Sequence, residues 1–274
     1  MINKIVNLIV GKNTVSLTCY VPSTIERNLY KKTKPAVLIL PGGGYEFTYE
    51  GEGEPIALKL MSEGISSFVL NYSVRPNLFP QALAEALVAI KYIRENADLF
   101  GIDQNNISVM GFSAGGHLAG CTGTLWEHYS LNELLECDRT QYRPNKLILC
   151  YPVLKSTGRH HDGSFRSILG EKYNEESLYM VDLPKQVKDN TPPTFLWHTF
   201  EDNGVPVDSS IEFGQALLAK NILFEMHIYP HGGHGLCLDD HTTWNVPFGK
   251  RSEVSRWIDE AIRFIFDDRL IKSV

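Results

Sequence analysis

The chain is poor in two classes of residue whose abundance would point to a particular kind of protein. Its 274 residues include five cysteines, an odd number without a pair of C-x-x-C motifs. This pattern indicates neither a disulfide framework nor a zinc site. Basic residues are also scarce, since 26 lysines and arginines face 32 aspartates and glutamates, for a net charge of −6. A nucleic-acid partner favours a basic face, so we expect none.

Long apolar runs are missing as well. No stretch approaches the roughly 20 apolar residues that a membrane-spanning helix needs. Residues 1–10 are apolar but interrupted by polar side chains, and they lack the apolar core and small-residue cleavage site of a secretory signal. We therefore read this segment as a strand and expect a cytoplasmic protein with no membrane association.

What the chain does contain fits an ordinary globular protein. Its length of 274 residues and its hydrophobic fraction of 43% favour one α/β domain over residues 1–274, with a substantial core. The sequence leaves open whether the protein forms a homo-oligomer.

A strand-turn-helix pattern surrounds one serine. Residues 106–110 are mostly apolar, residues 111–115 read Gly-Phe-Ser-Ala-Gly, and residues 116–119 can start a helix. In a nucleophile elbow of this form, the central serine occupies a strained turn with its hydroxyl exposed above a helix N-terminus. Flanking glycines suit the turn because side chains there would crowd the strand and the helix. We therefore predict Ser113 as a nucleophile.

A glycine-rich loop follows an earlier strand. Residues 35–40 are apolar and lead directly into Pro41-Gly42-Gly43-Gly44-Tyr45. Acyl transfer needs preorganised donors for the developing oxyanion, most often backbone N–H groups. We predict that Gly43 and Gly44 supply them together with Ala114, the residue after the serine. A phosphate-binding loop is disfavoured, because the run lacks both a Walker lysine and a G-x-G-x-x-G pattern.

An acid and a base follow the serine at the ends of two further predicted strands. Residues 194–198 resemble a late strand and precede Asp202, which could accept a hydrogen bond from an imidazole. Residues 224–229 alternate like a last strand and precede His234, which glycines flank. We predict Asp202 as the orienting acid and His234 as the general base. The alternative candidates are Glu201 and Asp208 for the acid and His231 for the base.

The remaining histidines are expected to have structural roles. Residues 160–162 and 239–241 combine histidine with aspartate, but solvated loops are a better reading than metal ligation. His117 falls in the helix after the elbow and is expected to make a structural hydrogen bond. His198 ends a strand near Asp202 and is a packing or supporting residue rather than the base.

The order of the elements predicts an open, mostly parallel sheet of about eight strands flanked by helices. In such sheets ligands bind at the carboxyl ends of the strands, where all three predicted catalytic residues lie. Residues 83, 86, 87, 90 and 93 recur at helical spacing and mark one buried helix face. The expected strands are 4–10, 14–21, 36–40, 66–72, 107–111, 146–151, 194–198 and 224–229, and the clearest helices are 54–63 and 81–96.

Residues 153–192 interrupt the alternation of strands and helices. They are polar, with scattered glycines and one short helical stretch, and we expect them to form a small cap over the active site. Tyr45 and Phe47, which follow the donor glycines, are predicted to line the substrate pocket. Tyr49 and Trp244 are further candidates, and packing of cap against core is the alternative role for these aromatics.

These motifs resemble one known family. Pro-Gly-Gly-Gly-Tyr, Gly-Phe-Ser-Ala-Gly-Gly-His, Asp-x-x-Val-Pro and the late His-Gly resemble the α/β-hydrolase esterases, over roughly residues 35–265. The most similar group contains the bacterial acetyl-xylan and feruloyl esterases and relatives of hormone-sensitive lipase. A proline precedes the glycines here, where the lipase branch has histidine, which favours the carbohydrate-esterase branch.

The resemblance implies an α/β-hydrolase fold and a serine carboxylesterase that needs no cofactor or metal. Its substrate would be a small-molecule ester with a short acyl group, preferably an acetyl ester of a carbohydrate such as a xylo-oligosaccharide. Two alternatives stay open. One is a peptidase or amidase of the prolyl-oligopeptidase type, with Glu46 and Glu50 facing the substrate. The other is a noncatalytic binding protein, which the intact set of Ser113, Asp202 and His234 disfavours.

Overall fold

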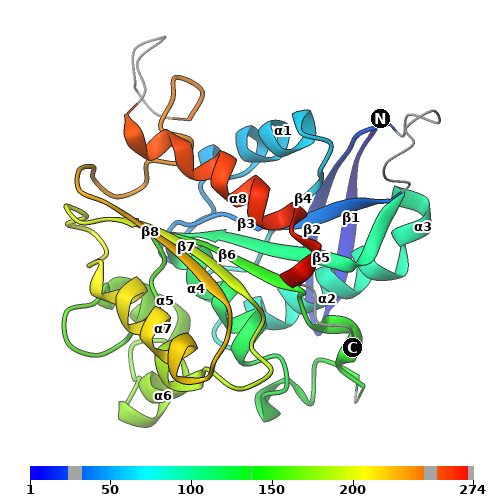
Figure 1. The fold of residues 1–274 in the computed structure, drawn as a ribbon. Coiled ribbons are helices and arrows are strands. Elements are labelled where there is room, and N and C mark those ends of the chain that lie inside the picture. Colours follow the sequence, from blue (N-terminus) through cyan, green and yellow to red (C-terminus); the bar gives the residue numbers. More distant parts are fainter. Residues whose placement is uncertain (24–32, 137, 244–251, 271–274) are drawn as a thin grey trace.

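The structure is a computed structural model that describes residues 1–23, 33–136, 138–243 and 252–270. Within these residues eight strands form one sheet in the order β1-β2-β4-β3-β5-β6-β7-β8 (Figure 1). The strands are β1 (Ile2–Val10), β2 (Asn13–Val21), β3 (Lys34–Leu40), β4 (Ser66–Asn71), β5 (Ile102–Phe112), β6 (Lys146–Cys150), β7 (Thr194–Thr199) and β8 (Phe224–Tyr229).

The sheet is mostly parallel, as predicted. Strand β2 pairs antiparallel with both β1 and β4, while every pair from β4 through β8 is parallel. The largest difference from the expected boundaries is in β5, which begins at Ile102 rather than 107. Ile102 pairs with Lys34 across an irregularity in the ladder, so this polar stretch joins the strand without an apolar signal.

Helices cover both faces of the sheet. Figure 1 shows α1 and α8 on one side and α2, α4 and α7 on the other. The helices are α1 (Glu54–Ser62), α2 (Gln81–Glu95), α3 (Ala97–Phe100), α4 (Ser113–Thr124), α5 (Asp162–Leu169), α6 (Glu175–Met180), α7 (Asp208–Ala219) and α8 (Trp257–Phe266). The short 3-10 helices are η1 (Glu50–Glu52), η2 (Tyr129–Leu131), η3 (Thr140–Tyr142), η4 (Leu183–Gln186), η5 (Glu253–Arg256) and η6 (Asp268–Leu270).

Alternation along the strands explains why both layers are needed. In β3, Val37 and Ile39 pack in the core layer under α1 and α8, whereas Leu38 and Leu40 pack in the layer with α2 and α4. Because successive side chains of a strand point to opposite faces, a strand that is apolar throughout must be covered on both. The apolar run at 35–40 therefore specifies an interior strand.

The segment 153–192 contains α5, α6 and η4 and packs beside the loop that follows β3. The Ser167 hydroxyl donates to Glu46 Oε1 over 3.4 Å, and the Phe165 ring meets His117 of α4 edge-on at 5.5 Å. The segment thus lies next to the carboxyl ends of β3 and β5.

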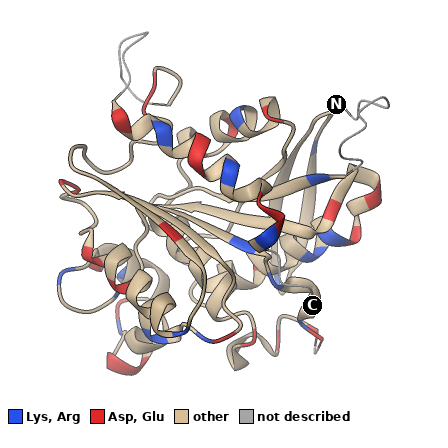
Figure 2. Cartoon of the chain, viewed as in Figure 1, with Lys and Arg blue, Asp and Glu red and all other residues tan. Residues whose placement is uncertain are grey.

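Charged residues on the outer helices are mixed in sign. Acidic and basic residues alternate along η5 and α8 (Figure 2), where Arg263 contacts Glu260 at 2.7 Å. Across the described ranges, none of the helices combines the length and the apolar character that crossing a membrane requires.

Two buried cations lie at the opposite edge of the sheet, where the central strands begin. Lys146, at the start of β6, is fully buried, and its Nζ donates to the carbonyls of Phe264, Ile265 and Asp267 at 3.2, 2.6 and 3.0 Å. Lys146 therefore satisfies carbonyl groups at the C-terminal end of α8. Arg94, at the end of α2, likewise donates to main-chain carbonyls, among them Gln104 O at 3.0 Å.

Candidate active site

Ser113 lies at a sharp turn between β5 and α4. Its φ is 53°, in the left-handed region that non-glycine residues rarely adopt. The neighbouring glycines are required by close packing. A Cβ on Gly111 would lie 2.1 Å from the carbonyl oxygen of Gly115, and one on Gly115 would lie 2.1 Å from that of Leu40. The local sequence thus permits a turn that holds the serine hydroxyl clear of the helix.

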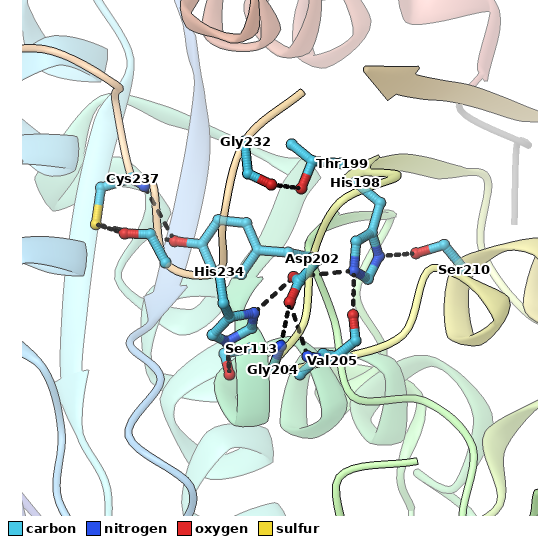
Figure 3. Close-up of polar contacts among 12 residues, drawn as sticks. Ser113, His198, Thr199, Asp202, Gly204, Val205, Ser210, Gly232, His234 and Cys237 are labelled. Atoms are coloured by element: carbon cyan, nitrogen blue, oxygen red, sulfur yellow. Dashed lines mark hydrogen bonds and ion pairs between the residues drawn. The ribbon is translucent and has the colours of Figure 1, made fainter. Parts of the chain in front are cut away.

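The structure brings Ser113, His234 and Asp202 into one chain of hydrogen bonds (Figure 3). His234 Nδ1 lies 2.7 Å from Asp202 Oδ2, and its Nε2 lies 2.8 Å from Ser113 Oγ. Because an ionised carboxylate only accepts hydrogen bonds, Nδ1 carries the proton and donates it. Nε2 is then free to accept the hydrogen bond from the Ser113 hydroxyl.

Asp202 is held by four donors. Its Oδ1 accepts the N–H groups of Gly204 and Val205, both at 2.8 Å, while Oδ2 accepts from His234 and from His198. Burial raises the pKa of Asp202, but the hydrogen bonds from the two histidines and from Val205 outweigh it. The net pKa lies well below the ordinary value, so the carboxylate stays ionised.

His198 supports the acid from the opposite side to His234. It is fully buried at the end of β7, and its Nε2 lies 3.0 Å from the carbonyl of Val205 and 3.2 Å from Asp202 Oδ2. Nε2 must therefore carry the proton and donate, and Nδ1 accepts the Ser210 hydroxyl at 2.8 Å. This confirms the prediction that His198 is a supporting residue.

The rival acids and base lie elsewhere. His231 is exposed and contacts Glu201 at 3.1 Å, so these two residues pair with each other at the surface. Asp208 accepts from Arg159 at 2.6 Å, at the start of α7. None of the three has a contact with Ser113 among the described residues.

The loop after β3 presents N–H groups beside the serine. A Cβ on Gly42 would lie 2.9 Å from Ser113 Cβ, so the two turns are in direct contact. The carbonyls of Gly42 and Gly43 accept the N–H groups of Tyr49 and Glu46, each at 3.0 Å, so they are already paired within the loop.

Three N–H groups at this junction remain available for a ligand. In the part of the chain that the structure describes, the N–H groups of Gly43 and Gly44 donate to no hydrogen bond. Ala114 is the second residue of α4, where an N–H has no acceptor within its own helix. These are the three donors that the sequence predicts for an oxyanion.

The predicted pocket wall needs correction at Tyr45. Its φ of 59° turns the side chain into the core, where it is 2% exposed and donates its hydroxyl to His117 Nδ1 at 2.7 Å. His117 Nε2 in turn donates to the carbonyl of Val181 at 3.0 Å, which confirms the structural hydrogen bond predicted for this histidine. Tyr45 therefore anchors the glycine loop to α4 instead of facing an open pocket. Phe47 is 57% exposed beside Gly43, and Trp244 lies outside the described residues.

The two histidine-aspartate segments make local contacts. His161 accepts the Ser164 N–H at 3.2 Å and so caps α5, and Asp239 accepts the Ser252 N–H at 3.1 Å. In the described ranges no group of three or more His, Cys, Asp and Glu side chains is arranged to hold a metal ion.

Sequence reasoning missed one buried carboxylate at this edge of the sheet. Glu52 is 3% exposed and accepts hydrogen bonds from the N–H of Gly42 and the hydroxyl of Tyr151, both at 2.6 Å. Burial raises the pKa of Glu52, and the hydrogen bonds from Tyr151 and Gly42 partly offset the rise. No sequence signal separates it from the exposed glutamates nearby, Glu50 and Glu54.

Sequence comparison identifies relatives over most of the chain. The BD-FAE family model matches residues 20–217. Endo-1,4-beta-xylanase B of Butyrivibrio fibrisolvens is 39% identical over 208 residues, which is 74% of this chain and 32% of that protein. The acetylxylan esterase of Xylanibacter ruminicola is 30% identical over 206 residues, covering 73% of this chain and 40% of that protein. The chain thus spans less than half the length of these two relatives.

Solved structures match over nearly their whole length. The acetyl ester-xyloside bifunctional hydrolase of Caldicellulosiruptor lactoaceticus superimposes with a TM-score of 0.81 at 35% identity, covering 96% of this chain and 91% of that one. An α/β-hydrolase enzyme from a Medee basin deep-sea metagenome library gives a TM-score of 0.76 at 31% identity, with 98% of each chain covered. The α/β-hydrolase fold implied by the sequence motifs is therefore confirmed.

Proposed function

The chain belongs to the BD-FAE family of α/β-hydrolase esterases, and from that membership we propose that it is a serine esterase acting on short acyl esters, with carbohydrate acetyl esters as its preferred class. The observation that carries this proposal is the hydrogen-bonded chain from Asp202 through His234 to Ser113, which ends beside unpaired backbone N–H groups. This geometry supports nucleophilic acyl transfer.

In the proposed reaction, Ser113 Oγ attacks the ester carbonyl while His234 Nε2 removes its proton. The 2.8 Å contact between these atoms already provides the path for that proton. Asp202 holds the imidazole in the tautomer that can accept and stabilises the imidazolium that forms.

The developing oxyanion would accept the N–H groups of Gly43, Gly44 and Ala114. Donors fixed in the backbone need no reorganisation during the reaction, which is why such sites lower the barrier. His234 then returns its proton to the leaving alcohol, and water repeats the sequence on the acyl-enzyme.

Support for the substrate class comes from the relatives. Two matched proteins are named for acetylxylan and for acetyl ester-xyloside hydrolysis, and a third is named a xylanase. Phe47, exposed beside Gly43, is the candidate wall for a short acyl group.

Labelling with a fluorophosphonate tests the reaction class, because the probe reacts with an activated serine. We expect stoichiometric labelling of the wild type, none of Ser113→Ala, and normal labelling of Ser62→Ala, whose serine is exposed at the end of α1. An unlabelled, folded wild type would contradict a serine esterase.

A parallel assay of aryl acetates, acetylated xylo-oligosaccharides and aminoacyl amides then separates the substrate classes. We expect the acetylated oligosaccharides to give the largest kcat/KM. Amide hydrolysis above ester hydrolysis would instead favour a peptidase, and equal rates on both acetates would leave a general short-chain esterase.

A further inference from the structure

Behind the proposed catalytic residues lies a buried network that connects two loops from distant parts of the sequence. Glu52 of η1 accepts the N–H of Gly42 through Oε2 and the hydroxyl of Tyr151 through Oε1, each at 2.6 Å. The Tyr151 oxygen also accepts the N–H of Cys237 at 3.2 Å. The network thus runs from the glycine loop after β3 to the loop after β8.

Each end of the network is attached to a proposed catalytic element. Gly42 directly precedes Gly43 and contacts Ser113, so the peptide that Glu52 holds is the one that leads into the oxyanion donors. At the other end, Cys237 is three residues after His234. The Tyr151 ring lies edge-on to the His234 ring, with centroids 5.1 Å apart and planes at 73°.

The backbone conformation is unusual at Tyr151 and at its partner Cys237. Tyr151 has φ 36° and Cys237 has φ 53°, although neither is glycine. Such conformations cost free energy and persist where surrounding contacts hold them, often at functional sites. The two short hydrogen bonds to the buried Glu52 carboxyl, each 2.6 Å, are contacts that can hold these loops in place.

We propose that Glu52 is a positioning residue that, through Gly42 and Tyr151, aligns the oxyanion loop with the loop that carries His234. This inference rests on the proposed function. It adds a role that the triad alone does not contain: the relative placement of two elements that β3 and β8 supply from different parts of the sheet.

The carboxylate is required because it accepts from two donors at once. In Glu52→Gln the side chain keeps its size, but an amide has one acceptor oxygen where the carboxylate has two. Because Gly42 and Tyr151 donate to different oxygens of Glu52, the single amide oxygen can replace only one of them, and the other donor then faces an NH2 group. A loop that moves by a fraction of an ångström should lower the rate of the chemical step more than it weakens substrate binding.

The test compares Glu52→Gln with the matched control Glu85→Gln. Glu85 is also fully buried, and it accepts the N–H and hydroxyl of Ser73 at 2.7 and 2.6 Å, with no hydrogen bond to Ser113, Gly42 or Tyr151 among the described residues. We expect Glu52→Gln to lose about 10- to 100-fold in kcat on p-nitrophenyl acetate, with KM within about threefold of the wild type. Glu85→Gln should lower the melting temperature and leave kcat within about twofold.

Tyr151→Phe provides an independent second variant, because it keeps the bond between Glu52 and Gly42 but severs the link to Cys237. We expect about a tenfold loss of kcat, and a double variant no worse than Glu52→Gln alone, since both changes break one network. A folded Glu52→Gln enzyme with kcat within twofold of the wild type would overturn the proposal, as would losses that multiply in the double variant. If Glu52→Gln does not fold, an unchanged kcat in Tyr151→Phe overturns it.

Failure of the proposed function looks different. In that case the wild type itself neither hydrolyses esters nor reacts with a fluorophosphonate, and no catalytic geometry is left for Glu52 to align. If the wild type is labelled but hydrolyses none of the esters tried, the labelling rate of Ser113 replaces kcat, with the same expected loss in Glu52→Gln.

Discussion

The parallel strands of the sheet begin at one edge and end at the other, and buried charges lie at both edges. Where the strands begin, Lys146 and Arg94 donate to main-chain carbonyls, including those at the end of α8. Where they end, Asp202 and Glu52 accept from a histidine, a tyrosine and backbone N–H groups. The first edge ties structural elements together, and the second holds the side chains that the proposed reaction uses.

Backbone strain is also concentrated at the edge where the strands end. Among the described residues, five of the six non-glycine positions with positive φ follow the carboxyl ends of strands β3, β5, β6 and β8, and the sixth, Asn221, precedes β8. Strain of this kind is retained where neighbouring contacts offset it. The contrast predicts that changes where the strands begin should lower the melting temperature and leave turnover nearly unchanged, whereas changes where the strands end should lower turnover.

The largest effect should come from Ser113→Ala. Without the hydroxyl no acyl-enzyme can form, so we expect kcat on p-nitrophenyl acetate to fall by about 10⁴- to 10⁶-fold, with the melting temperature nearly unchanged. More than about a hundredth of the wild-type activity in Ser113→Ala would show that another group is the nucleophile.

A substitution of Asp202 should lower kcat somewhat less than Ser113→Ala does. Asp202→Asn keeps the shape of the side chain, but the amide can no longer hold His234 in the tautomer that accepts from Ser113, so we expect roughly 10⁴-fold lower kcat. The matched control is Glu201→Gln, one residue earlier and exposed, which should stay within about threefold. Equal losses in the two variants would mean that the acid has been assigned wrongly.

The acid also links stability to pH. Its pKa is lowered in the folded state, so its ionised form stabilises the protein above the unfolded pKa of roughly 4, and that contribution is lost as the pH falls further. Asp202→Asn lacks the contribution at every pH. The difference in melting temperature between the two proteins should therefore begin to narrow as the pH falls below about 4, and it should keep narrowing toward the lowered folded-state pKa of Asp202.

Much of this edge could be predicted from the sequence because its signals are local. Apolar runs end at glycine, proline or polar residues, so strand ends are visible in the sequence. Residues of the right chemistry follow three of these ends, Ser113 directly and Asp202 and His234 a few residues later. Parallel strands bring such ends together without further information.

The rest could not be predicted, because it depends on contacts between distant segments. Glu50, Glu52 and Glu54 look alike in the sequence, and only the fold buries the middle one against Tyr151. Tyr45 was expected in the pocket from its position after the glycines, but the conformation of one residue and a partner 72 positions away turn it inward. In the sequence Lys146 is only the polar start of a strand, and its role becomes visible when the fold brings the carbonyls at the end of α8 within reach of its Nζ.

Acyl length should produce a moderate effect at the functional edge. We expect acetyl and propionyl esters to exceed octanoyl esters in kcat/KM, because each methylene kept out of apolar surroundings forfeits about 0.8 kcal/mol. If Phe47 forms the wall, Phe47→Ala should raise the octanoyl-to-acetyl ratio by roughly three- to tenfold. A wild-type rate that rises steadily from acetyl to octanoyl would point to a lipase-like enzyme instead.

The smallest effect on activity, and the sharpest test of the contrast, is expected at the opposite edge. Lys146→Met keeps most of the side-chain volume but removes the donor to Phe264, Ile265 and Asp267, which leaves carbonyls at the end of α8 without this cation. An unsatisfied buried acceptor lowers the free energy of unfolding by about 1–3 kcal/mol, so the melting temperature should fall by roughly 5 °C. The labelling rate of Ser113 and kcat should stay within about twofold. A tenfold loss of kcat in a folded Lys146→Met protein would mean that α8 transmits its position to the carboxyl edge, and the two edges would then not be separable.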